Sequence, residues 1–230
     1  TVNLKKVIGR PHGAPDVITF ELAQDVTLSG GLTLQVADVI ISGQGKLADG
    51  FTCTPASADY TVSKEENANI WHGQMQEEDR ALKLTKADGS IVYYPDSLEG
   101  RTSAFTAAGN NPGSTLQLQQ DITCSAKTIK GQFSIDLNGH VLTLSKSAYF
   151  QISATGNLQL INTNKEQEGV LAANESSTVA VSIRGGSLSI GENVKVTGST
   201  ILLEKTPGGT LTVAGTIDTT GTANAPIMGN

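Results

Sequence analysis

The sequence predicts an all-β protein that folds as a right-handed parallel β-helix, a solenoid whose coils contain about 23 residues. Composition is the first reason: charged residues make up 17% and aromatic residues 4% of the 230 residues, and glycine occurs 25 times. A helical bundle would need more Ala, Glu, Lys and Leu in 3.6-residue phase. Val, Ile and Leu recur along the whole chain, so the composition argues against disorder. A long and a short internal repeat are the other two reasons.

The long repeat covers residues 18–43, which align without a gap over residues 114–139. Identical pairs share the polar and glycine positions, and further pairs share apolar positions. The identical residues are Thr19, Gln24, Asp25, Thr27, Ser29 and Gly43, matched by Thr115, Gln120, Asp121, Thr123, Ser125 and Gly139. The chain therefore contains the same starting unit twice.

The short repeat is Gly-x-Leu-x-(Leu/Ile/Val), which begins at Gly156, Gly186 and Gly209. Ile135-Asp136-Leu137 fits the same slot without the glycine, so the first apolar residues recur after 23, 30 and 23 residues. The longer interval predicts a surface loop around Lys165–Gly169. A period near 23 with alternating strands is typical of a β-solenoid, in which inward residues stack from coil to coil.

The stretch Asn138-Gly139 between alternating apolar runs has the form of a two-residue β-hairpin turn. The same slot recurs as Ser42-Gly43, Ile161-Asn162, Gly191-Glu192 and Ala214-Gly215, in phase with the coils. We therefore interpret it as a solenoid corner, where Gly and Asn tolerate a left-handed backbone.

Stacked coils require Leu158, Leu188 and Leu211 to form one inward column. Further strands are expected at Val141–Leu144, Tyr149–Ser153, Val179–Ile183, Val194–Val196 and Ile201–Leu203.

Two short helices are expected to cap the open ends of coils. One spans roughly Leu98–Ala108, with Ser97 or Asp96 as its N-cap and Gly109 at its end. Its Leu98, Phe105 and Ala108 would face the core. The other candidate is Val2–Ile8, in a segment of similar rhythm.

Residues 51–90 interrupt the repeat. This segment could form a hairpin with Tyr60 and Val62 on one strand and Ile70 and Trp71 on the other. Trp71, the only tryptophan, is expected to pack that hairpin rather than to stack on a sugar. The segment 77–85, EEDRALKLT, begins either a strand or a short helix.

These boundaries divide the chain into three parts. We predict a first β-helix unit at 1–50, made of a helix cap and coils, and a linker or small β insert at 51–90. The second β-helix unit, 91–230, has its helix cap at 97–109 and its coils at 113–230. The final stretch 224–230 predicts that the solenoid is truncated there.

A family resemblance is carried by residues 97–123, SLEGRTSAFTAAGNNPGSTLQLQQDIT, followed by 133–144, FSIDLNGHVLTL. Together they resemble the opening unit of pectin-lyase-like, right-handed parallel β-helix repeat modules in bacterial cell-surface and adhesin-like proteins. Gly156–Asn162 resembles their next coil, and Leu4–Leu47 is similar to a variant of the opening unit. The resemblance implies the fold, but such β-helices include noncatalytic stalks and adhesins as well as pectate-lyase-like enzymes and phage tailspikes.

No constellation of residues in the sequence predicts chemistry. A lyase site needs clustered carboxylates and a basic group, whereas Asp136 is expected to point outward between two buried residues, and nothing brings it to Arg184. His12, His72 and His140 are isolated, and His140 is expected to face solvent. We therefore assign no catalytic, cofactor-binding or metal-binding residue.

Two further features of the sequence carry little functional information. Cys53 and Cys124 have no metal-binding spacing, and we favour two small apolar residues over a disulfide. The outward residues of successive coils are Asn157 and Gln159, Ser187 and Ser189, and Thr210 and Thr212. They are too mixed for an ice-binding threonine array and are interpreted as ordinary surface polarity.

Charge and hydropathy exclude two classes of partner. The formal charge is −6 and the longest basic run is Lys5-Lys6, so no nucleic-acid partner is expected. No run of 18 apolar residues could span a membrane. We expect a noncatalytic structural or adhesive module of a secreted or surface-anchored bacterial protein, whose solenoid face meets glycan or protein partners. The alternative is a polysaccharide lyase or glycoside hydrolase of the β-helix type.

Overall fold

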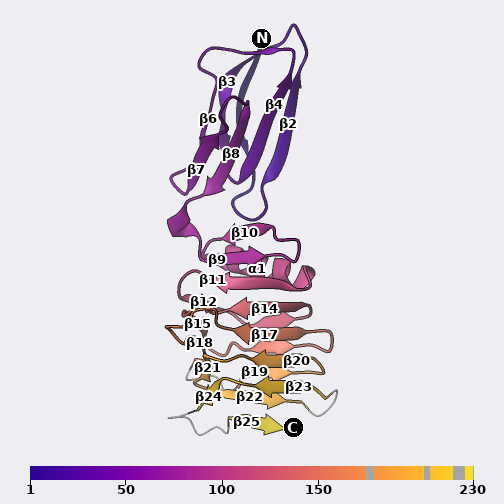
Figure 1. Ribbon diagram of the computed structural model, residues 1–230, viewed down its shortest axis with the longest axis vertical. Coiled ribbons are helices and arrows are strands. Elements are labelled where there is room, and N and C mark those ends of the chain that lie inside the picture. The colour runs from indigo at the N-terminus through magenta and orange to yellow at the C-terminus, as the bar shows by residue number, and fades with distance from the viewer. Residues whose placement is uncertain (175–178, 205–207, 220–225, 230) are drawn as a thin grey trace. The chain divides into compact units, whose positions relative to one another are not determined.

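The computed structural model describes residues 1–174, 179–204, 208–219 and 226–229 (Figure 1). It is an all-β structure with one α-helix, and parallel coils of about 23 residues stack in it as a β-solenoid of about 9 turns. The predicted fold class is confirmed. The chain divides into two compact units, one of Thr1–Arg80 with Tyr93–Pro95 and the other of Ala81–Val92 with Asp96–Asn230.

The first unit is built from two sheets, named here by their first strands. The β1 sheet contains β1 (Val2–Ile8), β3 (Thr27–Leu34), β5 (Lys46–Leu47) and β6 (Thr52–Pro55). The β2 sheet contains β2 (Asp16–Leu22), β4 (Ala37–Gly43), β8 (Ile70–Met75) and β7 (Tyr60–Lys64), and a 3₁₀ helix follows at Glu77–Asp79.

Successive strands β1 to β4 alternate between these two sheets, so each coil of the first unit has two strands. The predicted helix at Val2–Ile8 is wrong: all seven residues pair in parallel with β3, from Val2 opposite Leu28 to Ile8 opposite Leu34. Strand β3 provides hydrogen-bond partners for the backbone of this segment. A helix would have to satisfy the same groups internally, and the β-branched residues of the segment disfavour it. The predicted hairpin is confirmed, since β7 and β8 pair antiparallel and β8 extends the sheet beside β4.

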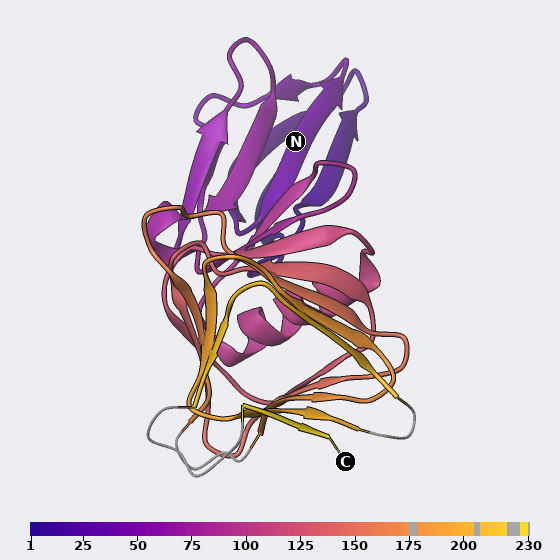
Figure 2. The same cartoon turned by 60° about the horizontal axis from the view of Figure 1, so that its bottom comes forward.

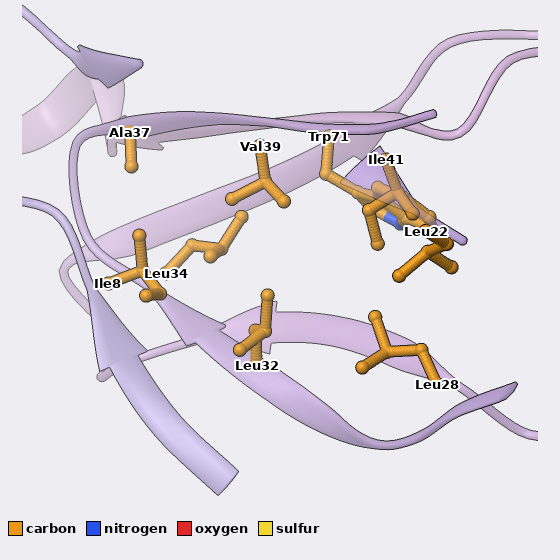
Figure 3. Packing of buried hydrophobic residues seen from close by; sticks show 9 residues of the cluster. All are labelled: Ile8, Leu22, Leu28, Leu32, Leu34, Ala37, Val39, Ile41 and Trp71. Carbon is orange, nitrogen blue, oxygen red and sulfur yellow. The ribbon is translucent and has the colours of Figure 1, made fainter. Parts of the chain in front are cut away.

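The core of the first unit lies between the two sheets (Figure 3). Its buried side chains are Ile8, Leu22, Leu28, Leu32, Leu34, Ala37, Val39, Ile41 and Trp71. Trp71 is only 5% exposed and meets the ring of Phe51 edge-on, with centroids 5.9 Å apart. Its packing role is confirmed, because a buried indole offers no face to a sugar.

The second unit has three sheets and three strands in each coil. The β11 sheet runs β10 (Ile91–Tyr94), β9 (Leu82–Thr85), β11 (Ser114–Leu118), β14 (Gln132–Asp136), β17 (Asn157–Ile161), β20 (Ser187–Ile190) and β23 (Thr210–Val213). The β12 sheet runs β12 (Ile122–Cys124), β15 (Val141–Leu144), β18 (Gly169–Ala172), β21 (Val194–Thr197) and β24 (Thr216–Asp218). The β13 sheet runs β13 (Lys127–Ile129), β16 (Phe150–Ile152), β19 (Val179–Ile183), β22 (Thr200–Leu203) and β25 (Ile227–Gly229). Figure 2 shows these sheets as three sides around a shared interior.

Inward residues of the second unit stack in parallel register from coil to coil. The predicted column is confirmed, because Leu158 pairs with Leu188 and Leu188 with Leu211; the first two are buried and Leu211 is half-buried. The slot assigned to Ile135 was two residues out of register. Phe133 pairs with Leu158, so the coil begins at Gly131 and follows the glycine pattern like the others.

The stretch Asn138-Gly139 is a corner, as predicted. Asn138 and Gly139 have φ values of 50° and 80°, and the His140 amide donates to the Leu137 carbonyl at 2.8 Å. The turn has the left-handed backbone of a hairpin turn, yet β14 and β15 on either side of it belong to different sheets.

Helix α1 (Leu98–Asn110) packs against β9, β11 and β14. Its N-cap is Ser97, whose hydroxyl accepts from the Gly100 amide at 2.9 Å, as expected. Phe105 and Ala108 are buried, but Leu98 is 66% exposed, so its predicted core position is wrong. The buried side of the helix also contains Gly100 and Ala104, and Leu98, in the first turn, lies at its margin.

Candidate binding face

The outward surface of the β11 sheet carries two columns of uncharged polar side chains. Parallel register places Thr115, Ser134, Gln159, Ser189 and Thr212 in one column, continued by Thr85 of the antiparallel β9. The second column contains Gln132, Asn157, Ser187 and Thr210. These ten residues are called the polar face below. Because successive strands lie about 4.8 Å apart, each column repeats a hydroxyl or amide at that interval.

A shallow hollow of about 230 Å³ lies on the polar face. Its lining includes the side chains of Gln132, Ser134, Asn157 and Gln159. The Ser134 hydroxyl donates to Gln159 Oε1 at 3.3 Å, which links the side chains of neighbouring coils. Hydroxyl and amide groups donate and accept, so this surface can pair with neutral, hydroxyl-rich ligands.

The outward surfaces of the other two sheets carry ion pairs. On the β12 sheet, Lys195 contacts Asp218 at 2.7 Å. Beside the β13 sheet, Arg184 Nε contacts Glu204 at 2.6 Å; this pairing raises the pKa of Arg184 and lowers that of Glu204. Arg184 therefore pairs with Glu204 and not with Asp136. None of the ten residues of the polar face is charged, and Lys83 of β9 lies on the same sheet surface outside these columns, opposite Gln117.

Asp136 is buried, so the prediction that it points outward is wrong. Its carboxylate accepts four hydrogen bonds: from Gln117 Nε2 at 2.7 Å, from the amide of Asn138 at 3.0 Å, and from the amide and hydroxyl of Thr163 at 2.9 and 2.6 Å. Strand alternation places it outward, but the following corner and the first residues after β17 fold over it. Its contacts organise a corner.

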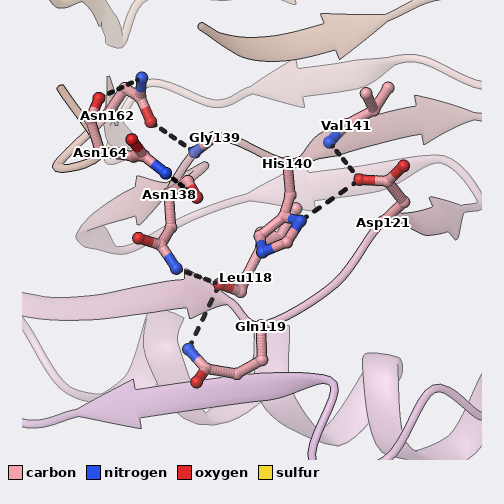
Figure 4. A network of polar contacts seen from close by, with 9 residues as sticks. All are labelled: Leu118, Gln119, Asp121, Asn138, Gly139, His140, Val141, Asn162 and Asn164. Carbon is pink, nitrogen blue, oxygen red and sulfur yellow. Dashed lines mark hydrogen bonds and ion pairs between the residues drawn. The ribbon is translucent and has the colours of Figure 1, made fainter. Parts of the chain in front are cut away.

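Asparagine side chains join this corner to the preceding coil and to the two coils that follow (Figure 4). Asn138 Nδ2 donates to the Leu118 carbonyl at 3.1 Å, and the Gly139 amide donates to Asn162 Oδ1 at 2.7 Å. Asn162 Nδ2 in turn donates to the Asn193 carbonyl at 3.1 Å. The backbone groups freed by each bend are thus satisfied by amides, as buried polar groups require.

His140 lies at the same corner and is partly exposed. Its Nδ1 is 3.4 Å from Asp121 Oδ1, and the same carboxylate oxygen accepts from the Val141 amide at 2.9 Å (Figure 4). The prediction that His140 faces solvent is therefore only partly correct, because its side chain is 30% exposed. Asp121 thus connects two neighbouring coils through His140 and the Val141 amide.

His72 of the first unit sits between two carboxylates. Its Nδ1 is 2.7 Å from Asp38 Oδ1 and its Nε2 is 3.1 Å from Glu65 Oε1. The hydrogen bond to Asp38 is the main cause that raises the pKa of His72, and Glu65 adds to it. Sequence analysis could not find this group, because it requires β4 and β8 to be neighbours. The ladder also places Ser63 opposite His72, but both ring nitrogens are occupied by carboxylates, so no Ser-His-Asp relay forms.

The two cysteines and the remaining histidine, His12, belong to none of the groups described above. Cys53 and Cys124 are free thiols in different units, and burial raises the pKa of each to about 11. The His12 ring lies 5.8 Å from the ring of Tyr94. Within the residues that the structure describes, no three His, Cys, Asp or Glu side chains gather as metal ligands.

Sequence analysis identified six members of the polar face but interpreted them as ordinary surface polarity. It missed the other four. Gln132 and Ser134 were missed because the slot in that coil was placed two residues too late, and Thr85 and Thr115 because they lie on strands that precede the glycine repeat. The glycine at Gly131 is the signal that could have corrected the register.

Comparison with known proteins gives no relative: no family model, curated protein or solved structure matches the chain. Over the described part of the chain, no helix has the length and apolar character needed to cross a membrane.

Proposed function

We propose that this chain is a noncatalytic structural and adhesive module of a secreted or surface-anchored bacterial protein, and that its polar face binds neutral glycans. The observation that supports this is the uncharged polar face itself, set against ion-paired surfaces on the other two sheets. Sugar hydroxyls pair with serine, threonine and amide groups without the desolvation cost that a charged side chain would bring.

The stacked coils suit such a role because they present the same kind of group at a fixed interval on a supported surface. Beneath the polar face, Ile135, Leu160 and Ile190 form a buried column, so the strands that carry the outward residues are held from behind. Repeated weak contacts along one chain add up by effective concentration. A long polysaccharide is therefore a better partner for this face than a single sugar.

The test is binding of the full chain to a panel of immobilised neutral polysaccharides, measured by biolayer interferometry. Gln159→Lys places an ammonium at the centre of the polar face and is expected to weaken binding by about tenfold or more, because the charge must be desolvated. The matched control is Thr143→Lys, on the outward surface of the β12 sheet, which should leave binding unchanged.

Three results would contradict the proposal. One is absence of binding to every polysaccharide of the panel, and another is equal loss in both variants. The third is release of unsaturated sugars or of free reducing ends during incubation, which would instead support the lyase or hydrolase alternative.

A further inference from the structure

A second concave site lies in the second unit, between α1 and the strand β13. This cleft, called the α1 cleft below, has a volume of about 400 Å³. That volume is within the range of small-molecule sites. None of its lining residues belongs to the polar face or to the corner network, although Phe133 also lines the hollow on the polar face.

The floor of the α1 cleft is apolar. Phe105 of α1 meets Phe133 edge-on, with ring centroids 6.5 Å apart, and Ile129 lies beside them in the lining. All three residues are buried, with Phe105 7%, Ile129 3% and Phe133 4% exposed. One end of the cleft is closed where Gly131 lies against the backbone of Gly109, so closely that a Cβ on Gly131 would overlap it.

The rim of the α1 cleft is basic. Lys127 and Lys130 both line it, and no carboxylate does. Lys127 Nζ is 3.2 Å from the Thr102 hydroxyl and 5.6 Å from the centre of the Phe105 ring. Within the described part of the chain, neither lysine has a carboxylate within ion-pair distance. The site thus holds two ammonium groups that form no ion pair with a carboxylate of the described residues.

The C-terminus of α1 does not account for these lysines. Two of its last carbonyls are bound by other groups: Ala107 accepts from the Asn111 side chain at 2.7 Å, and Ala108 accepts from the Ser114 hydroxyl at 3.2 Å. Lys127, moreover, contacts Thr102 in the first half of the helix, far from the negative end of the helix dipole.

We propose that the α1 cleft binds a small organic anion, with an apolar ring on Phe105 and Phe133 and its acidic group between Lys127 and Lys130. A ring fits the aromatic edges of the floor. A carboxylate, sulfonate or phosphate accepts charge-assisted hydrogen bonds from both ammonium groups. Thr102 and Thr106 are exposed on the cleft side of the helix, so the anion can reach its donors from solvent.

The experiment is a fluorescence titration of the full chain with 8-anilinonaphthalene-1-sulfonate, an aromatic probe that carries one sulfonate. Lys127→Gln with Lys130→Gln is expected to weaken binding by about tenfold or more, because two charge-assisted contacts are lost. The matched control replaces Lys83 and Lys86, which line no part of the cleft, by glutamine; it changes the net charge equally and should retain affinity within about twofold. Circular dichroism checks that each variant keeps its fold.

Two further measurements locate the probe. N-phenyl-1-naphthylamine, which has the same rings without the sulfonate, should bind the wild type about tenfold more weakly, and the lysine variants should not change its affinity. Thr106→Trp fills the cleft and should abolish binding of both probes. The proposal is overturned if the Lys127/Lys130 variant binds the sulfonate like the wild type. It is also overturned if both lysine pairs weaken binding equally, if the neutral probe binds as tightly as the sulfonate, or if the Thr106→Trp variant still binds both probes.

Discussion

Replacement of Asp136 by alanine is expected to destabilise the second unit by about 3 kcal/mol, although the side chain is only a short carboxylate. Its four hydrogen bonds tie the corner at Asn138 to Thr163 of the next coil and to Gln117 of the previous one. Three successive coils therefore lose a shared acceptor in one substitution.

The size of this destabilisation depends on which of the four donors can form hydrogen bonds to water after the substitution. The Thr163 hydroxyl and the Gln117 amide belong to exposed and half-buried residues, so they can turn to solvent at little cost. The main-chain amides of Asn138 and Thr163 point into the corner and stay in place. Each costs about 1 to 1.5 kcal/mol when left unpaired, and together they account for most of the 3 kcal/mol. Asp136→Asn keeps one oxygen for both amides and should cost only about 1 to 2 kcal/mol.

The assay is urea denaturation followed by far-UV circular dichroism, with Asp121→Asn as the control. Asp121 is 69% exposed and holds one backbone amide, so its replacement should cost less than about 1 kcal/mol. Trp71, the only tryptophan, reports the first unit through its fluorescence and gives an internal reference. If Asp136→Ala lowers the free energy of unfolding no more than Asp121→Asn does, the carboxylate is not what holds the corner.

Two other predictions concern the interior and the pH dependence of the two units. Leu160→Ala removes a fully buried side chain and should cost about 2 to 5 kcal/mol in urea denaturation, whereas Gln159→Ala, one residue earlier and exposed, should cost less than about 0.5 kcal/mol; equal costs would contradict the inward column. The folded-state pKa of His72 is raised above 6.5, so the bonds to Asp38 and Glu65 stabilise the first unit fully below that pH, and the stabilisation is lost as the pH rises through the raised pKa. His72→Gln should flatten this pH dependence of the Trp71 fluorescence transition, and an unchanged pH profile would refute the assignment.

The sequence predicted stacked coils well because their signal is periodic. Glycine and alternating leucines recur once per coil, and the structure stacks them in register as the pattern requires. The corner at Asn138-Gly139 was identified for the same reason, since a hairpin would not recur at the coil period. The polar interior of that corner could not be predicted. Asp136 obeys strand alternation and should be exposed, but residues 27 positions later fold over it.

The two helix predictions differ in the same way: the one that depends on residues close in the sequence is correct, and the one that depends on a distant strand is wrong. Ser97 caps α1 by accepting a hydrogen bond from the amide of Gly100, three residues later. This contact depends only on residues that are close in the sequence. Val2–Ile8 has a pattern that suits a helix or a strand, and its partner β3 lies 26 residues away. The group around His72 was invisible for a related reason, because β4 and β8 must first pair before Asp38 can reach the imidazole.

The two copies of the long repeat fold differently, which shows how far neighbours decide local structure. Residues 27–34 form the single strand β3, whereas the equivalent residues 123–130 form β12, a corner and β13. In the first unit β3 lies along the whole of β1, and Gly30 packs against the Leu4 carbonyl, where a Cβ would overlap it. In the second unit the next coil divides its strands at 145–149, and β12 and β13 pair with the two halves separately. A sequence match of this kind therefore identifies a coil, and the coil stacked on it sets the number of sheets. The two proposed binding surfaces depend on distant neighbours in the same way: the polar face is built from residues of six strands, and the α1 cleft lies between a helix and the strand β13.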